Sequence, residues 1–116
     1  MYVNREELAW ASGLFEGEGS MGYYPTSGSR GQLQMQMSMT DEDPIRRFAQ
    51  AVGVGRVSGP YRNKPKDKQF WRWAAWRHEE IQAAVAMLWG GLGRRRKEQA
   101  KKSLSAHCSA RTSRCS

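Results

Sequence analysis

The sequence predicts an α+β fold, in which helices pack on one face of a curved, four-stranded antiparallel sheet in the order α-β-β-α-β-β-α. Three observations carry this prediction. The segment QLQMQMSMT, residues 32–40, alternates polar and apolar side chains with the period of a β-strand. Three segments with helical features are separated by pairs of strand-like segments. The length of 116 residues suits one compact domain with one core.

The first elements follow from caps and turns. Asn4, with Glu7 three residues later, predicts a capped helix over residues 5–16 that ends at the glycines after it. A short strand is expected over residues 20–24. The loop PTSGSRG then leads into the alternating strand, whose Leu and Met side chains face the core.

The second half of the predicted sheet is built in the same way. Asp43 as the cap and Pro44 as the first helical residue predict a helix that stops at Gly53. Strands are expected over residues 55–61 and 69–76, with a basic loop between them. A third helix is expected over residues 77–92. The inward apolar residues of the two helices are Ile45, Phe48, Ala49, Val52, Ile81, Val85 and Leu88.

Charge divides the chain unevenly. Residues 1–93 carry 11 Lys and Arg against 10 Asp and Glu, a net charge of +1, whereas residues 94–116 carry 8 against 1, a net charge of +7. The basic segment, which could be helical, suits nucleic-acid phosphates, although a membrane surface or simple solubility would also explain it. We divide the chain into a domain of residues 1–104 and a basic, Ser-rich tail of residues 105–116.

Several classes of protein are excluded by composition. No run of about 18 apolar residues exists, so we expect no membrane span, and the N-terminus lacks the layout of a signal peptide. Two cysteines, both near the C-terminus, do not form a disulfide framework or a zinc site. We expect a reducing, cytoplasmic compartment of a prokaryote, a phage host or an organelle.

The outward face of the alternating strand carries no charge. Its side chains are all uncharged groups that can form hydrogen bonds, although the chain has a net charge of +8. This pattern indicates a face that meets a partner with its own donors and acceptors, or else a Gln-rich face that meets only water. The residues concerned are Gln32, Gln34, Gln36, Ser38 and Thr40.

The first helix contains a stripe of small residues, Ala9, Gly13 and Gly17. A glycine inside a helix costs roughly 1 kcal/mol relative to alanine, so Gly13 requires an offsetting gain. Close packing against another helix backbone would supply it, and so would making room for a Trp of the same chain. Just beyond the stripe lie Glu16 and Glu18, whose carboxylates suit a hard divalent cation.

The segment ASGLFEGEGS resembles the signature of the LAGLIDADG homing endonucleases. Residues 11–19 match the nine motif positions in order, and the resemblance covers roughly residues 6–104. Two departures stand out. The second acidic place holds Glu where Asp is commoner, and the first two places hold Ala11 and Ser12, which we expect to weaken a dimer interface slightly.

The resemblance implies a role for each matching residue. Motif helices of two domains would pack at Gly13 and Gly17, with Ala9 alongside. Glu18 and the carbonyl of Gly17 would hold Mg²⁺ or Mn²⁺ at the scissile phosphate. The sheet would lie in the DNA major groove, where Gln can pair with adenine and Arg with guanine or phosphate. The DNA-binding residues would be Ser20, Tyr24, Arg30, Gln32, Gln34, Gln36, Ser38, Arg56 and Arg72.

The family also places a lysine near the metal, and Lys97 or its neighbour Arg96 fits that place; a general phosphate-binding role fits the two equally well. Thr40 stands near where the family carries a polar residue that orients water. With Glu18, these would be the catalytic residues. The resemblance implies a site-specific DNA endonuclease, a homodimer acting on a palindromic or near-palindromic duplex. A non-catalytic DNA-binding protein and an RNA-splicing maturase remain alternatives, and Glu18 favours the enzyme.

Overall fold

The computed structural model describes residues 4–25 and 31–115, and it has the predicted α+β architecture. Four strands form one antiparallel sheet in the order β1-β2-β4-β3. The strands are β1 (Gly19–Pro25), β2 (Gly31–Met39), β3 (Arg56–Tyr61) and β4 (Phe70–Ala75). The helices are α1 (Arg5–Glu18), α2 (Glu42–Val52), α3 (His78–Leu88), the short 3₁₀-helix η1 (Trp89–Gly91) and α4 (Arg94–Cys115).

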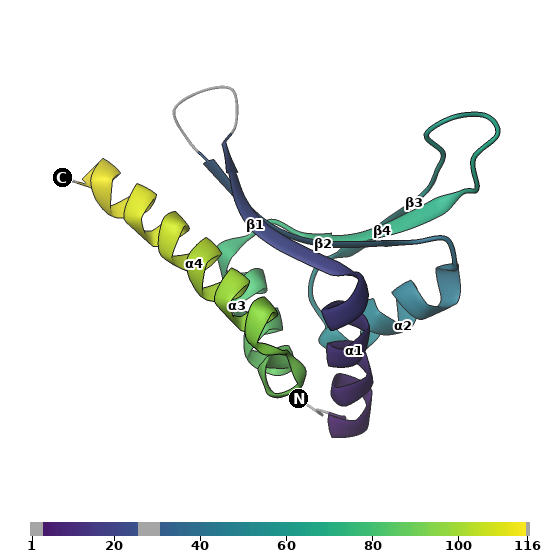
Figure 1. Ribbon diagram of the computed structural model, residues 1–116, viewed down its shortest axis with the longest axis horizontal. Coiled ribbons are helices and arrows are strands. Elements are labelled where there is room, and N and C mark those ends of the chain that lie inside the picture. Colours follow the sequence, from purple (N-terminus) through teal and green to yellow (C-terminus); the bar gives the residue numbers. More distant parts are fainter. Residues whose placement is uncertain (1–3, 26–30, 116) are drawn as a thin grey trace.

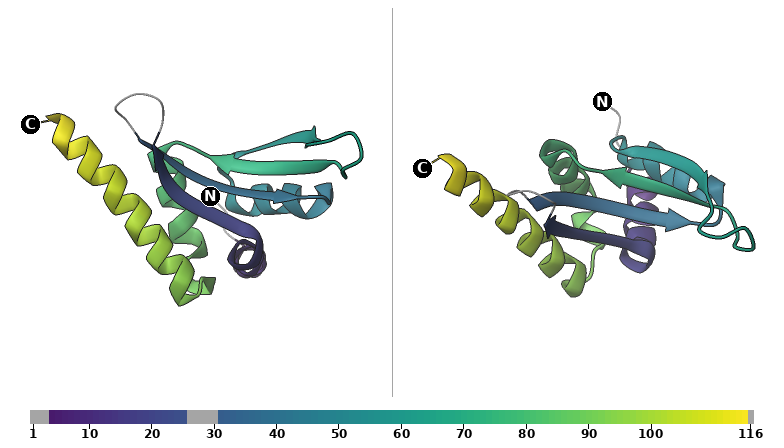
Figure 2. Two further views of the ribbon diagram at one scale, coloured as in Figure 1. Left: turned by 45° about the horizontal axis from the view of Figure 1, so that its top comes forward. Right: turned by 90° about the horizontal axis from the view of Figure 1, so that it is seen from above.

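The helices lie together beneath the sheet. Figure 1 shows α1, α2 and α3 below a curved sheet whose ends rise on the opposite side. In the view from above, the strands lie in front of these helices and α4 runs along the β1 side (Figure 2, right). Among the described elements, no helix covers the upper sheet face, which confirms the predicted single layer of helices.

The core fills the space between the sheet and the helices. Strand β2 contributes Leu33, Met35 and Met37, all of them buried, so the alternation predicted for this strand is confirmed. The indole of Trp73 lies at the centre, edge-on to Phe48 at 4.8 Å between ring centroids. The inward residues predicted for α2 and α3 are buried, with Ala49 partly so. Burying such side chains contributes about 1.5–3 kcal/mol each.

Helix α1 begins as predicted but extends further. The side chain of Asn4 accepts a hydrogen bond from the Glu7 N–H at 3.0 Å, which is the expected cap. The helix continues through Gly17 and ends at Glu18, two residues beyond the predicted end. It stops there because Gly19 adopts an extended conformation and pairs with Met37 in the sheet.

Helix α2 begins earlier than predicted. Asp41 occupies the cap position without a side-chain cap hydrogen bond, and Pro44 is the third helical residue rather than the first. Proline is tolerated there because the first four N–H groups of a helix have no intrahelical acceptor. The predicted stop at Gly53 is confirmed, since this glycine has φ of 77° in the left-handed region.

The basic C-terminal segment is a packed helix rather than a loose arm. On the inner side of α4, Ala100 and Ser103 are buried and Leu104 packs against the core. The helix contacts β1 at Met21 and Tyr23, where the two elements line a shared cavity. Helix α4 crosses the predicted boundary at residue 104 without a break, so the division into domain and tail stays a prediction. Within the described residues, no helix is both long and apolar enough to cross a membrane.

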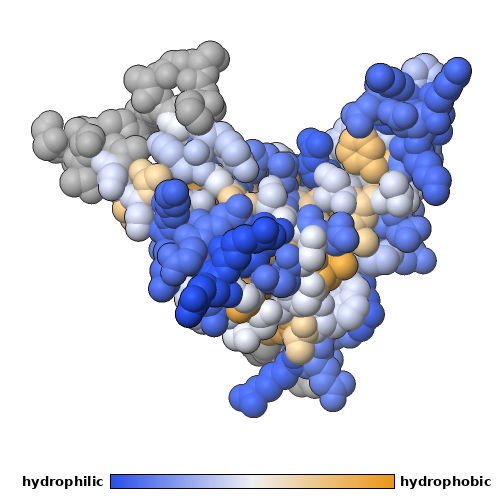
Figure 3. Space-filling view, viewed as in Figure 1, coloured by the Kyte–Doolittle hydropathy of each residue, from blue (hydrophilic) through white to orange (hydrophobic). Residues whose placement is uncertain are grey.

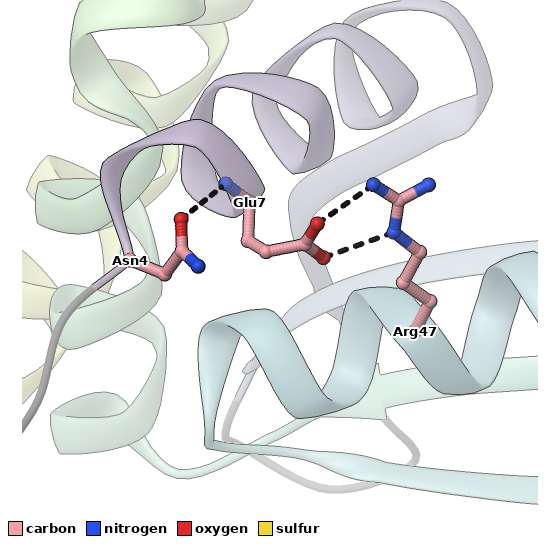
Figure 4. Close-up of polar contacts among 3 residues, drawn as sticks. All are labelled: Asn4, Glu7 and Arg47. Carbon is pink, nitrogen blue, oxygen red and sulfur yellow. Dashed lines mark hydrogen bonds and ion pairs between the residues drawn. The ribbon is translucent and has the colours of Figure 1, made fainter.

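An ion pair ties the beginning of α1 to α2. Arg47 donates two hydrogen bonds to the carboxylate of Glu7, at 2.9 and 2.7 Å (Figure 4). The guanidinium also lies over the ring of Trp10, 3.9 Å from its centroid. The Glu7 side chain therefore turns to α2 instead of bonding back to Asn4, as a full capping box would require.

We expect the Glu7→Gln variant to unfold at a lower temperature than the wild type at neutral pH. The hydrogen bonds from Arg47 hold the pKa of Glu7 below its ordinary value of 4.5, and slight burial opposes this shift. A lowered pKa stabilises the fold above the unfolded-state pKa, and this contribution is lost as the pH falls through the folded-state pKa. The difference between the two proteins should therefore disappear in acid, as thermal unfolding followed by circular dichroism would show.

Glu6→Gln is the matched control for this variant. Glu6 lies in the same first turn of α1 and shares the effect of the helix dipole, but no ion pair is recorded for it in the part of the chain that the structure describes. An equal loss in both variants would assign the effect to the dipole rather than to Arg47.

Candidate nucleic-acid interface and metal site

The outward side chains of the four strands form rows, most of whose members are polar, across the open sheet face. Strand register sets the rows, because paired residues in an antiparallel sheet point to the same side. One row runs across all four strands, through Ser20, Gln36, Ala74 and Arg56. The next row joins Ser38, Arg72 and Ser58. The structure thus brings most of the predicted DNA-binding residues onto one surface.

The Gln residues of β2 are held in place by their amide groups. The Gln34 amide donates to the Gln36 amide oxygen at 3.1 Å, and Gln32 donates to the carbonyl of Leu33 at 3.0 Å. No recorded bond among the described residues uses the oxygen of Gln34 or the nitrogen of Gln36. An acceptor and a donor therefore remain available side by side on the outward face, which is the pair of groups that an adenine edge requires.

Arg72 lies near the middle of the sheet face with its guanidinium supported on three sides. Its Nε donates to the Ser38 hydroxyl at 3.4 Å. The guanidinium also lies 5.9 Å from the ring centroid of Tyr61 and 5.8 Å from that of Phe70. These neighbours restrict the side chain, so less conformational entropy would be lost when it binds a base or phosphate.

The remaining predicted contact residues differ in their placement. Tyr24 and Arg56 are exposed on the same face, with Tyr24 at 41% exposure. Thr40 is exposed one residue after the end of β2. Arg30 lies outside the described residues. In the space-filling view the upper edge of the molecule dips over the sheet and rises to a hydrophilic tip at the β3–β4 hairpin (Figure 3).

Glu18 is the last residue of α1, directly before the first residue of β1. Its side chain is exposed, and no hydrogen bond or ion pair is recorded for it within the described residues. The neighbouring carbonyl of Gly17 is one of the last four of the helix, which have no intrahelical donor. The two preceding carbonyls are occupied, since Phe15 accepts from Gly19 and Glu16 accepts from Arg96 at 3.2 Å.

This donor set fits part of a magnesium or manganese site. Carboxylate and carbonyl oxygens are the ligands that hard divalent cations prefer, and Mg²⁺ takes six of them, some from water and phosphate. In residues 4–25 and 31–115, no group of three or more His, Cys, Asp and Glu side chains could hold a metal. One chain would therefore contribute only Glu18 and the Gly17 carbonyl, and the remaining ligands would have to come from a second chain, DNA or water.

Glu16 and Arg96 join the end of α1 to the beginning of α4. The Glu16 carboxylate accepts from the Gly93 N–H at 3.0 Å, next to the positive end of the α4 dipole. Arg96 also donates to Gln99 at 2.9 Å, so this guanidinium is largely occupied by the fold. Sequence reasoning missed this role of Glu16, because its partner lies 77 residues away.

Lys97 is placed differently from Arg96. Its ammonium lies 5.3 Å from the ring centroid of Trp89, and that of Lys101 lies 5.9 Å from the same ring. Of the two cations predicted for the active site, Arg96 directly contacts the end of α1 and Lys97 contacts η1.

The stripe of small residues on α1 faces outward. Ala9, Gly13 and Gly17 are all exposed, and a Cβ built on Gly13 or Gly17 would meet no atom of the described residues within 4 Å. Gly13 therefore does not make room for a Trp of the described chain, and the alternative explanation of this glycine is wrong. A helix backbone from another molecule could approach this stripe closely.

The first two motif positions have a different role from the predicted one. Ala11 and Ser12 are buried within the chain, at 0% and 2% exposure, so they do not weaken a dimer interface. The Ser12 hydroxyl lies 2.8 Å from the Leu8 carbonyl oxygen and 3.0 Å from that of Leu88, within hydrogen-bonding reach of both. A Cβ on Gly91 would meet the Cβ of Ser12 at 2.3 Å, so small residues here let η1 approach α1 closely.

One outward residue was missed by the sequence analysis. Trp76 follows β4 and is 48% exposed, and its carbonyl accepts a hydrogen bond from Gln32 at 3.5 Å. The signal was present in the strand QFWRWAAW, where Phe70, Arg72, Ala74 and Trp76 share one parity.

Solved structures of LAGLIDADG homing endonucleases share this fold. The homing endonuclease I-CvuI, solved with its target in the presence of calcium, matches with a TM-score of 0.75 and 15% identity, over 95% of this chain and 71% of that chain. The meganuclease I-AabMI bound to uncleaved DNA matches with a TM-score of 0.71 and 17% identity, over 97% of this chain and 38% of that chain. The archaeal intron-encoded homing endonuclease I-Vdi141I complexed with DNA matches with a TM-score of 0.62 and 13% identity, over 73% of this chain and 55% of that chain. No family sequence model and no curated protein sequence matches the chain, so the likeness is one of fold.

Proposed function

Because the chain has the fold of the LAGLIDADG homing endonucleases, we propose that it is a homing-type DNA endonuclease, which cuts a specific duplex by metal-dependent phosphodiester hydrolysis. One observation carries the proposal. An exposed carboxylate without a partner in the described chain, that of Glu18, directly precedes an open sheet face on which strand β2 presents uncharged hydrogen-bonding side chains. A surface that only met water would not need this combination.

The sheet face supplies sequence recognition in this proposal. Gln34 and Gln36 present one acceptor and one donor to an adenine edge, and Arg72 presents its guanidinium fork to guanine. Ser20, Ser38, Tyr24 and Gln32 extend the contact surface along β1 and β2, and Arg30 would extend it further. The weak net charge of residues 1–93 means that recognition here rests on hydrogen bonding more than on attraction to phosphate.

Glu18 and the Gly17 carbonyl would hold Mg²⁺ or Mn²⁺ at the scissile phosphate. When bound, such an ion polarises the phosphate and lowers the pKa of a bound water. The chain's own residues orient the reactants: Thr40 is proposed to position the attacking water, and Lys97 to stabilise phosphate charge. Arg96 holds the end of α1, and with it Glu18, in place through the Glu16 carbonyl.

We further propose that the active unit is a homodimer. Each chain offers one carboxylate at the site, and the exposed stripe Ala9, Gly13 and Gly17 allows two α1 helices to approach closely at this end of the sheet. Two-fold symmetry then presents two copies of the sheet to the DNA and implies a palindromic or near-palindromic target.

A selection experiment tests the proposal. Duplexes that the protein binds are enriched from a randomised pool, and the enriched duplex is incubated with Mg²⁺ or Mn²⁺. We expect cuts in both strands at fixed positions and no cuts with chelator. A protein that binds the duplex but never cuts it would be a DNA-binding protein of this fold, and preference for a folded intron RNA over duplexes would indicate a maturase.

We expect Gln34→Ala and Gln36→Ala to relax base preference. Each should weaken binding to the selected duplex by about 1–3 kcal/mol, because a bidentate base contact is lost. Binding to unrelated duplexes should hardly change, since neither side chain carries charge. Competition binding with single-base variants of the selected duplex measures this difference. Gln50→Ala on α2, on the helix side of the sheet, is the control, and uniform weakening on all duplexes would contradict base reading by this strand.

A further inference from the structure

A cavity of about 440 Å³ opens at the β3 edge of the sheet, where β3 begins and β4 ends. Ala74 and Ala75 form part of its lining, together with Arg56, Trp76, Arg77 and Glu80. Arg56 and the buried Ala74 are also paired in the row of residues that crosses the sheet face. The cavity is therefore continuous with the proposed DNA surface. Trp76 and Arg77 lie beyond the end of β4, outside the strands proposed to read bases.

The side chain of Trp76 is exposed without covering a core. The register of β2 and β4 pairs Met35 with Ala75, so the next residue, Trp76, shares the outward parity of Gln34. At 48% exposure, it is one of three large hydrophobic side chains that are exposed among the described residues. An indole left in water at a cavity wall provides a flat apolar surface for a partner.

The charges around the cavity favour an anion. Arg56 and Arg77 are both exposed, and in residues 4–25 and 31–115 no ion pair or side-chain hydrogen bond is recorded for either. The carboxylate of Glu80 accepts from the Gly55 N–H at 2.9 Å, so one of its oxygens already has a partner. Glu79 is exposed in the same turn of α3. The cavity is thus lined by two cationic side chains and one carboxylate, a net charge of +1 that favours an anion. Because this excess charge is small, we expect a phosphate that is part of a larger bound molecule rather than a free phosphate ion.

The width of the sheet indicates which part of DNA reaches this edge. Four strands at about 4.8 Å spacing place β1 and β3 roughly 14 Å apart, whereas the major groove is about 12 Å wide. When the middle strands β2 and β4 face the bases, the outer strands lie against the sugar–phosphate walls of the groove. The β3 edge therefore meets a backbone, where phosphate and deoxyribose alternate.

We propose that this edge cavity is a clamp for the DNA backbone, in which Arg56 and Arg77 bind a phosphate and Trp76 packs on the adjoining deoxyribose. The clamp rests on the proposed function, because the sheet must first bring duplex DNA to the edge. It would add affinity without reading sequence, since both contacts are to groups that every nucleotide shares.

The test combines charge removal with neutral phosphates. Arg77→Gln should lower the slope of log affinity against log salt by about 0.9 and weaken binding to selected and unrelated duplexes alike. Trp76→Ala should weaken both by roughly tenfold without changing the salt slope, as expected for about half of an aromatic ring's burial. Single methylphosphonates, which remove the charge of one phosphate, are then placed along the selected duplex. At one position the substitution should weaken the wild type clearly more than Arg77→Gln, in which only the Arg56 contact with that phosphate remains to be lost.

Arg46→Gln is the matched control, because it removes the same charge from α2, on the helix side of the sheet. The Arg46→Gln control should keep the wild-type salt slope. If Arg77→Gln keeps it too, the clamp is overturned while the endonuclease proposal stands. An absence of any methylphosphonate that distinguishes wild type from Arg77→Gln would overturn it equally. A wild-type protein that binds no duplex would overturn both proposals.

Discussion

Replacing Glu18 with Gln should abolish cleavage and leave duplex binding intact. Gln keeps the length and shape of the side chain but removes its charge. The carboxylate is exposed and has no recorded partner within the described residues, so the fold loses nothing by the change. A weakened metal site would remove several kcal/mol of transition-state stabilisation, which lowers the cleavage rate by about a thousandfold or more.

Single-turnover cleavage of the selected duplex measures the first effect, and fluorescence anisotropy without divalent metal measures binding. Binding should equal or exceed that of the wild type, because an anion beside phosphates is repulsive when no cation lies between them. Glu16→Gln is the control, with the same charge change two residues away. Its carboxylate holds the Gly93 N–H, so it should cost about 1 kcal/mol of stability and leave cleavage largely intact. Normal cleavage by Glu18→Gln would place the active site elsewhere.

Replacing Gly13 with Leu should convert the proposed homodimer into a folded monomer. A Cβ at this position meets nothing within 4 Å in the described chain, so the new side chain points into space that only a second molecule could fill. Because leucine favours a helix over glycine by somewhat less than 1 kcal/mol, the isolated chain should not lose stability. Specific cleavage should disappear with the dimer, because one chain offers only one carboxylate at the site.

Light scattering and circular dichroism together test this expectation. The variant should have the mass of one chain, 13.2 kDa, with wild-type helix content, whereas the wild type should have about twice that mass. Gly90→Leu is the matched control, since a Cβ on this glycine in η1 also meets no described atom within 4 Å and Gly90 lies off the stripe. A Gly13→Leu protein that remains dimeric and cuts DNA normally would show that α1 is not the interface.

The fold could be predicted where local rules acted alone. The alternation of β2 has only one interpretation, and Asn4 and Gly53 mark helix ends through their own backbone and side-chain geometry. The end of α1 was misplaced because glycine is compatible with both a helix interior and a helix end. The start of α2 was misplaced because Asp41 and Asp43 are equally good caps in sequence.

The sequence predicted which residues form the candidate site, but not the long-range contacts that hold them in place. Strand parity placed the outward Gln, Ser and Thr residues of 32–40 on one face. The glycine spacing predicted either close packing against another helix or room for a Trp of the same chain, and the structure excludes the second within the described residues. The contacts of Glu16 with Gly93 and of Glu7 with Arg47 join residues 77 and 40 positions apart. No local sequence pattern identifies such pairs, because the two partners come together only when the chain folds and neither stands out from other charged or small residues in the sequence.

The hydrogen bond between Gln34 and Gln36 makes two positions of the sheet into one unit for protein engineering. Each amide is the other's neighbour and partner, so an exchange at one position changes the rotamers open to the second. Free energies measured for the two single exchanges should not add up to that of the double exchange. A search for variants with new DNA targets would therefore vary positions 34 and 36 together in one library, and could vary Arg56, two strands away, on its own.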